Sequence, residues 1–125
     1  MNKSHREAIP VLNEALKFNP NNGDAYRELG WAYTKLMNYD KALFYRRKAV
    51  ELNPNDFYAI DGIAVAYIGL GKYDKAILVC NEGIRMNPNF EHFYCNRGFA
   101  YKGLKNYEQA FINFNKCIEI NPNNK

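Results

Sequence analysis

The sequence predicts an all-α fold of about seven helices, packed as antiparallel hairpins in one elongated domain. The main observation is a short segment, Asn-Pro-Asn followed by a variable residue, that begins at residues 19, 53, 87 and 121. The segment therefore recurs every 34 residues. A fixed period of this size is typical of repeat proteins whose units stack in a line. The second observation is composition, because 47% apolar and 15% aromatic residues supply enough buried area for an ordered core.

The period divides the chain into four parts, which we expect to form a single domain. A lone helix in residues 1–22 precedes three repeat units at residues 23–56, 57–90 and 91–125. The lone helix shares its small and apolar positions with the second helix of each unit. We therefore interpret it as the second half of a preceding repeat whose first helix is missing.

Apolar residues at spacings of three and four predict that the opening helix runs from about Ser4 to Phe18. Ser4 and Glu7 have the spacing of a capping box at its start. Pro10 is costly in a helix beyond the first turn, so we expect the regular helix to begin near Glu7.

Each repeat unit is expected to form two helices joined by a short turn, and helices joined in this way must lie antiparallel. An acidic residue at the start of each second helix suits the positive end of the helix dipole, and the proline of the repeated segment stops that helix. The expected helices are Asp24–Met37 and Asp40–Leu52, Phe57–Leu70 and Asp74–Met86, and Glu91–Leu104 and Glu108–Ile120.

Alignment of the three units shows rows of similar residues, which are the positions that a helical hairpin buries. The apolar and aromatic rows are Tyr33, Tyr67, Tyr101; Leu36, Leu70, Leu104; Tyr39, Tyr73, Tyr107; and Val50, Ile84, Ile118. Two alanine rows, which allow helices to approach closely, are Ala32, Ala66, Ala100 and Ala8, Ala42, Ala76, Ala110.

With these rows, the sequence resembles the tetratricopeptide repeat family over essentially its whole length. The signature in the first unit consists of Tyr26, Leu29-Gly30, Tyr33, Ala42, Ala49 and Pro54, with variations in the next two units. The resemblance implies a right-handed α-solenoid whose concave groove is lined by the first helix of each unit. Two arginines depart from the pattern, because Arg46 stands where a large apolar residue is usual and Arg97 where leucine is usual. We expect both to extend along apolar surface with the charge in solvent.

The resemblance also implies that a segment of a partner protein binds to the outward rows of the first helices. The candidate partner-binding residues are Arg27, Trp31, Lys35, Tyr58, Asp61, Val65, His92, Cys95, Asn96, Phe99 and Lys102. An apolar stripe of Trp31, Val65 and Phe99 would anchor a peptide. In the alternative interpretation, Trp31 and Phe99 pack against neighbouring helices.

Positive charge beside the stripe would suit an acidic or carboxylate-ended partner. It comes from Arg27, Lys35, His92 and Lys102. The competing interpretation is a solvated face only, because Asp24, Glu28 and Asp61 offset these charges.

One subgroup of the family holds the carboxylate of chaperone tails with a two-carboxylate clamp, and the corresponding positions here differ from it. They are Arg27, Trp31, Gly62, His92 and Asn96. Arg27 alone keeps the charge in full, and His92 would substitute weakly when protonated. We therefore do not expect strict clamp activity. Of the asparagine ladder that another subgroup uses, Asn96 alone is present.

These features predict a protein–protein interaction module, namely an adaptor, scaffold or co-chaperone-like domain. The alternative is a structural segment of a longer repeat array that self-associates through its open ends. This alternative follows from a chain that begins and ends inside the period, which would leave the face of Phe114, Ile118 and Ile120 partly uncovered.

We expect no catalytic residues, no metal site and no cofactor. The two histidines, His5 and His92, lie in separate elements, and no nucleophile and base stand at a recognised spacing. The segment 69–72, Gly-Leu-Gly-Lys, lacks the full spacing of a phosphate-binding loop.

Charge and cysteine content predict a cytoplasmic protein that binds neither nucleic acid nor membrane. The net charge of +4 is spread along the chain without a basic block. The start lacks the apolar core of a signal peptide, and no apolar stretch is long enough to span a bilayer. Cys80, Cys95 and Cys117 fit neither a disulfide framework nor a zinc site, which favours a reducing compartment.

Overall fold

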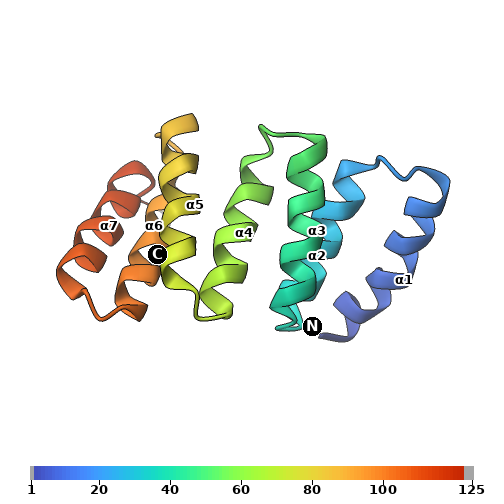
Figure 1. Ribbon diagram of the computed structural model, residues 1–125, viewed down its shortest axis with the longest axis horizontal. Helices are drawn as coiled ribbons and strands as arrows, with labels where there is room; N and C mark the ends of the chain where they lie inside the picture. The colour runs from blue at the N-terminus through green and yellow to red at the C-terminus, as the bar shows by residue number, and fades with distance from the viewer. Residues whose placement is uncertain (1, 123–125) are drawn as a thin grey trace.

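The computed structural model describes residues 2–122, and these residues form seven α-helices (Figure 1). The helices are α1 (Asn2–Phe18), α2 (Gly23–Lys35), α3 (Tyr39–Leu52), α4 (Phe57–Gly69), α5 (Tyr73–Met86), α6 (Glu91–Gly103) and α7 (Tyr107–Ile120). The predicted all-α fold is confirmed. The predicted bounds of the six repeat helices agree with the structure to within two residues at each end.

The helices form a row in chain order, and each packs against the next (Figure 1). The first helices of neighbouring units also touch, α2 against α4 and α4 against α6. These three helices therefore share one face of the row, where the sequence places the groove. In the described part of the chain, α1 packs against α2 alone.

The expected late start of the opening helix is wrong, because α1 begins at Asn2 and continues through Pro10. Proline removes the amide that would bond the carbonyl of Arg6, four residues earlier. Both Arg6 and Pro10 are exposed, so water can reach the freed carbonyl. Ser4 lies inside this helix and does not cap it.

The repeated Asn-Pro-Asn-X segment closes one unit and caps the first helix of the next. The side chain of Asn22 accepts a hydrogen bond from the amide of Ala25, and Asp56 does the same for Ala59, both at 3.1 Å. A cap of this kind satisfies an amide that the first helical turn leaves unpaired. In the third unit Phe90 takes this position and makes no side-chain cap.

The alanine rows form the centre of the core. Ala42, Ala66, Ala76 and Ala100 belong to one buried cluster that joins α3, α4, α5 and α6. Small side chains at these positions let the helices approach closely, and Leu43, Ile63 and Tyr67 fill the space around them. The predicted alanine rows are therefore buried in the repeat units.

The apolar rows are less buried in the third unit than in the second, and Ile118 belongs to the face that the sequence predicts to be partly uncovered. Leu104, Tyr107 and Ile118 are exposed, whereas Leu70, Tyr73 and Ile84 in the second unit are half-buried. The reason is that α7 packs against α6 and against no other helix in residues 2–122.

A disulfide joins Cys95 of α6 to Cys117 of α7, with 5.3 Å between their Cα atoms. The prediction that the cysteines fit no disulfide is therefore wrong. The two cysteines are 22 positions apart in the sequence, and the antiparallel hairpin brings them together. The inference of a reducing compartment loses its support from the cysteines. Cys80 is a buried free thiol, and burial raises its pKa to about 12.

We predict that reduction of the Cys95–Cys117 bond lowers the free energy of unfolding by about 3 kcal/mol. The reason is that the bond joins two positions 22 residues apart and so restricts the unfolded chain. Urea denaturation with and without a reducing agent measures the difference. The double variant Cys95→Ala/Cys117→Ala is the control and should not respond to the reducing agent. Equal stability of the oxidised and reduced wild type would contradict the prediction.

Candidate partner-binding groove

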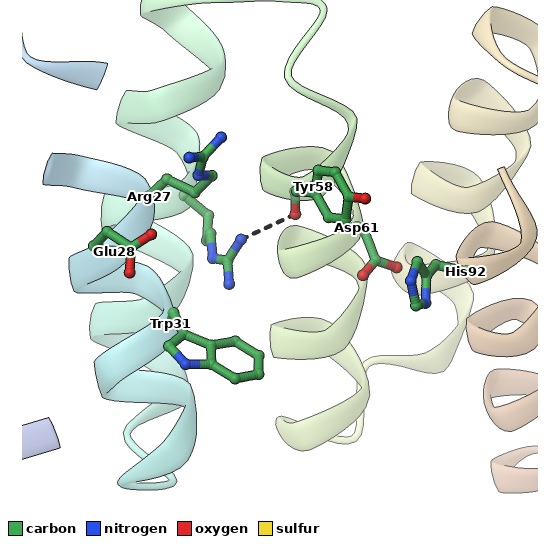
Figure 2. Close-up of a pocket in the computed structure, with 7 residues that line it drawn as sticks. Arg27, Glu28, Trp31, Tyr58, Asp61 and His92 are labelled. Atoms are coloured by element: carbon green, nitrogen blue, oxygen red, sulfur yellow. Dashed lines mark hydrogen bonds between the residues drawn. The ribbon is translucent and has the colours of Figure 1, made fainter. Parts of the chain in front are cut away.

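A cavity of about 520 Å³ opens on the face shared by the first helices (Figure 2). It is lined by Arg27, Glu28 and Trp31 of α2, Arg46 of α3, Tyr58 and Asp61 of α4, and His92 of α6. Five of the residues predicted from the sequence therefore meet in one place. Glu28 and Arg46 also line the cavity but were not among the candidates.

Other candidate residues lie beside this cavity. The Lys35 ammonium is 4.2 Å from the ring centre of Trp31, and the Asn96 side chain donates a hydrogen bond to Asp61. Val65 is half-buried on α4. We call the cavity, together with the outward face of α2, α4 and α6, the groove.

The remaining three candidates lie on α6 and do not line the cavity. Phe99 is 49% exposed and packs edge-on against Phe114 of α7, with 5.0 Å between the ring centres. Lys102 is exposed. The sulfur of Cys95 is bonded to α7, so this thiol is not free to contact a partner.

Aromatic side chains form two walls of the cavity. Trp31 on α2 is 44% exposed and Tyr58 on α4 is 60% exposed. Tyr58 packs edge-on against Phe90, at 5.2 Å between ring centres, and Phe90 also packs against His92 at 5.0 Å. The cavity walls therefore offer apolar area that is accessible to a partner.

The charge of Arg27 is already balanced by acidic neighbours. Its guanidinium lies 3.5 Å from the carboxylate of Asp24 and 3.3 Å from that of Asp56. The side chain of Asp56 is buried and also caps α4. Arg27 is thus less available to an anionic partner than the sequence suggested.

The expectation that Arg46 carries its charge into solvent is wrong, because Arg46 is 5% exposed. Its side chain lies in a slot between Gly30 and Gly62, which have no side chains of their own to fill this space. A Cβ atom built on Gly30 or Gly62 would lie 2.6 or 2.5 Å from the Arg46 Nε. The guanidinium donates a 2.9 Å hydrogen bond to the carbonyl of Tyr58, drawn as the dashed line in Figure 2.

Arg97 also differs from the expectation of a solvated charge. It is half-buried, and its Nε donates to Asn113 at 2.7 Å while another nitrogen donates to Asn81 at 2.9 Å. Asn113 is buried and donates in turn to the carbonyl of Gln109. Arg97 therefore links the second helices α5 and α7 through a polar network.

Asp61 is a half-buried carboxylate of the cavity. Burial raises its pKa to about 6, although the nearby charges of His92 and Arg46 and the hydrogen bond from Asn96 act in the opposite direction. Figure 2 shows this carboxylate turned toward His92. Ionised Asp61 therefore places a partly desolvated negative charge at the α6 side of the cavity at neutral pH.

The arrangement combines exposed aromatic rings with fixed charges of both signs, which is suited to holding a polypeptide segment. Within residues 2–122, no cluster of three or more His, Cys, Asp or Glu side chains is placed to hold a metal ion. In that same part of the chain, no helix has the length and apolar character required to cross a membrane.

Models of the tetratricopeptide repeat match residues 23–56, 59–90 and 93–124. The chain belongs to the tetratricopeptide repeat family. Domains of this family generally serve as protein–protein interaction modules and are typically non-catalytic. A comparison of the sequence with curated proteins gives no significant match.

Solved structures of tetratricopeptide repeat domains resemble the chain closely. MamA from Desulfovibrio magneticus RS-1 superposes with a TM-score of 0.82 at 24% identity, over 95% of this chain and 67% of that structure. A crystal structure of MamA protein gives a TM-score of 0.81 at 27% identity, over 93% of this chain and 63% of that structure. The first tetratricopeptide repeat domain of human RPAP3 gives 0.78 at 28% identity, over 85% and 84%. These similarities confirm the repeat fold.

We predict that Asp61→Asn removes a pH-dependent loss of stability. The folded-state pKa of about 6 exceeds the usual value, so Asp61 favours the folded state at low pH and this contribution is lost as pH rises from about 4 to 6. Over that range, wild type should lose on the order of 2–3 kcal/mol relative to Asp61→Asn.

Urea denaturation at a series of pH values measures this difference, and Asp74→Asn, at an exposed carboxylate of α5, is the matched control. A constant difference between wild type and Asp61→Asn from about pH 4 to pH 7 would show that the pKa of Asp61 is not raised.

Proposed function

We propose that this chain is an adaptor or scaffold domain that binds a segment of a partner protein in the groove. The observation that carries the proposal is the cavity itself, which collects side chains from three successive repeat units. Its volume of about 520 Å³ lies within the usual range for ligand sites. Family membership supports the same class of function.

Three exposed aromatic residues would anchor the segment. Trp31, Tyr58 and Phe99 come from α2, α4 and α6 and are 44%, 60% and 49% exposed. Aromatic side chains of this kind dominate the energy of many interfaces because they bury a large area with little loss of rotamer freedom. The anchors follow the row of units, so an elongated segment would meet them in turn.

Polar orientation would come from charged residues at the edge of the same surface. Lys35 lies over Trp31, Lys102 is exposed on α6, and Arg27 faces the cavity between its two acidic neighbours. Lys35 and Lys102 would favour a partner segment that carries acidic side chains or ends in a carboxylate.

Fluorescence of Trp31, the single tryptophan of the chain, tests the proposal directly. We predict that an acidic peptide of about ten residues, at concentrations up to about 100 μM, gives a saturable change, because binding covers the half-exposed indole. A basic peptide of equal length is the control and should give no change. The change should weaken in Tyr58→Ala. Absence of a saturable change with either peptide would contradict binding in the groove.

A second candidate function is assembly through the outer face of α7. Phe111, Ile112 and Ile118 on this helix are 67%, 51% and 49% exposed, which is unusual for neighbouring apolar side chains. A second copy of the chain would cover them. Light scattering on the fluorescence samples separates the two functions, because assembly predicts a mass that rises with concentration while Trp31 emission stays constant.

A further inference from the structure

Arg46 is a buried charge without an acidic partner in direct contact. Within residues 2–122, no carboxylate oxygen lies within 4.0 Å of its guanidinium, and its buried Nε has no hydrogen-bond partner. One nitrogen donates to the Tyr58 carbonyl. A buried cation in this state is costly, because its lost hydration is only partly replaced.

The acidic side chains nearby are committed elsewhere. Asp61 accepts a hydrogen bond from Asn96 and is turned toward His92 (Figure 2). Asp56 pairs with Arg27 and caps α4. Burial lowers the pKa of Arg46, and Asp61, Asp56 and Glu28 raise it through longer-range attraction. The guanidinium therefore stays charged and lacks a contacting anion.

The slot that holds Arg46 opens into the groove. Arg46 lines the cavity together with Trp31 and Tyr58, whose rings stand on either side on α2 and α4 (Figure 2). An acidic side chain of a bound segment would reach down between these rings, with its methylene groups against the aromatic walls. Its carboxylate would then meet a planar guanidinium, whose donors match two carboxylate oxygens.

We propose that Arg46 binds the side-chain carboxylate of an Asp or Glu in the partner segment, and so sets the position of that segment in the groove. This inference rests on the proposed function. A singly charged carboxylate suits the cavity better than a phosphate group, because Glu28 and Asp61 line the same cavity and repel a second negative charge. Arg27 is less suited to this role, because Asp24 and Asp56 already balance its charge.

Selection from a random peptide library displayed on phage tests the inference without a known partner. The peptides are fused through their carboxyl ends to the amino terminus of the coat protein, so they have no free terminal carboxylate. Any carboxylate that they offer therefore belongs to a side chain. The targets are wild type, Arg46→Met and, as matched control on the same helix, Arg47→Met. Arg47 is exposed and bonds to the hydroxyl of Tyr67, away from the cavity. We expect wild type and Arg47→Met to select peptides with an acid at one fixed position, and Arg46→Met to lose this preference.

Affinity measurements then isolate the contact. A selected peptide, amidated at its end, is compared with the same peptide carrying Gln for Glu or Asn for Asp at the fixed position. We expect the change to weaken binding to wild type at least about tenfold and to leave binding to Arg46→Met unchanged. Far-UV circular dichroism checks the fold of each variant. The wild-type comparison stands even where Arg46→Met does not fold.

The outcomes separate the two proposals. Three results would overturn the role of Arg46 and leave groove binding intact. They are the selection of peptides without a fixed acid, an acid preference that persists in Arg46→Met, and equal affinity of wild type for both peptides. Selection of basic peptides would also overturn it and would indicate a partner cation that contacts Asp61 or Glu28. Failure to select any peptide with wild type would overturn the proposed function, and the role of Arg46 with it.

Discussion

The centre of the groove depends on a guanidinium held between two glycines. Arg46 of α3 fills the space where α2 and α4 approach, because Gly30 and Gly62 have no side chains to occupy it. Its hydrogen bond to the Tyr58 carbonyl ties α3 to the start of α4. Its charge also lowers the cost of ionised Asp61 across the cavity. One polar side chain in an apolar row therefore shapes the site and adds a buried positive charge to it.

In the remaining architecture, the residues that pack the helices differ from those that face outward. Alanines in the facing rows set the distances between helices, and the capped Asn-Pro-Asn-X turns set the period. These features repeat from unit to unit and produce a regular row. The outward residues of α2, α4 and α6 do not repeat, so each unit contributes different chemistry to one surface. A regular scaffold can in this way carry a surface that differs along its length, which suits the proposed binding of a partner segment.

Features that repeat with the period were predictable from the sequence, and contacts between different rows were not. The hairpins, their bounds and five residues of the cavity follow from the 34-residue spacing and the resemblance to the family. The Cys95–Cys117 bond depends on a distance across a hairpin, which the aligned rows do not reveal. Burial of Arg46 depends on two glycines in different helices. Two features of the sequence could have indicated this burial. Arg46 stands in an apolar row, and Gly62 stands where the other units have Glu28 and Asn96.

A double-mutant cycle on Gly30→Ala and Arg46→Ala tests the glycine slot most directly. In wild type, the added methyl group meets the Arg46 side chain at 2.6 Å, whereas Arg46→Ala leaves room for it. The free energies of unfolding of the four proteins should therefore give a coupling of about 0.5–3 kcal/mol, with Gly30→Ala costing more in the presence of Arg46. A coupling near zero would contradict the account, because it would mean that Arg46 does not occupy the slot.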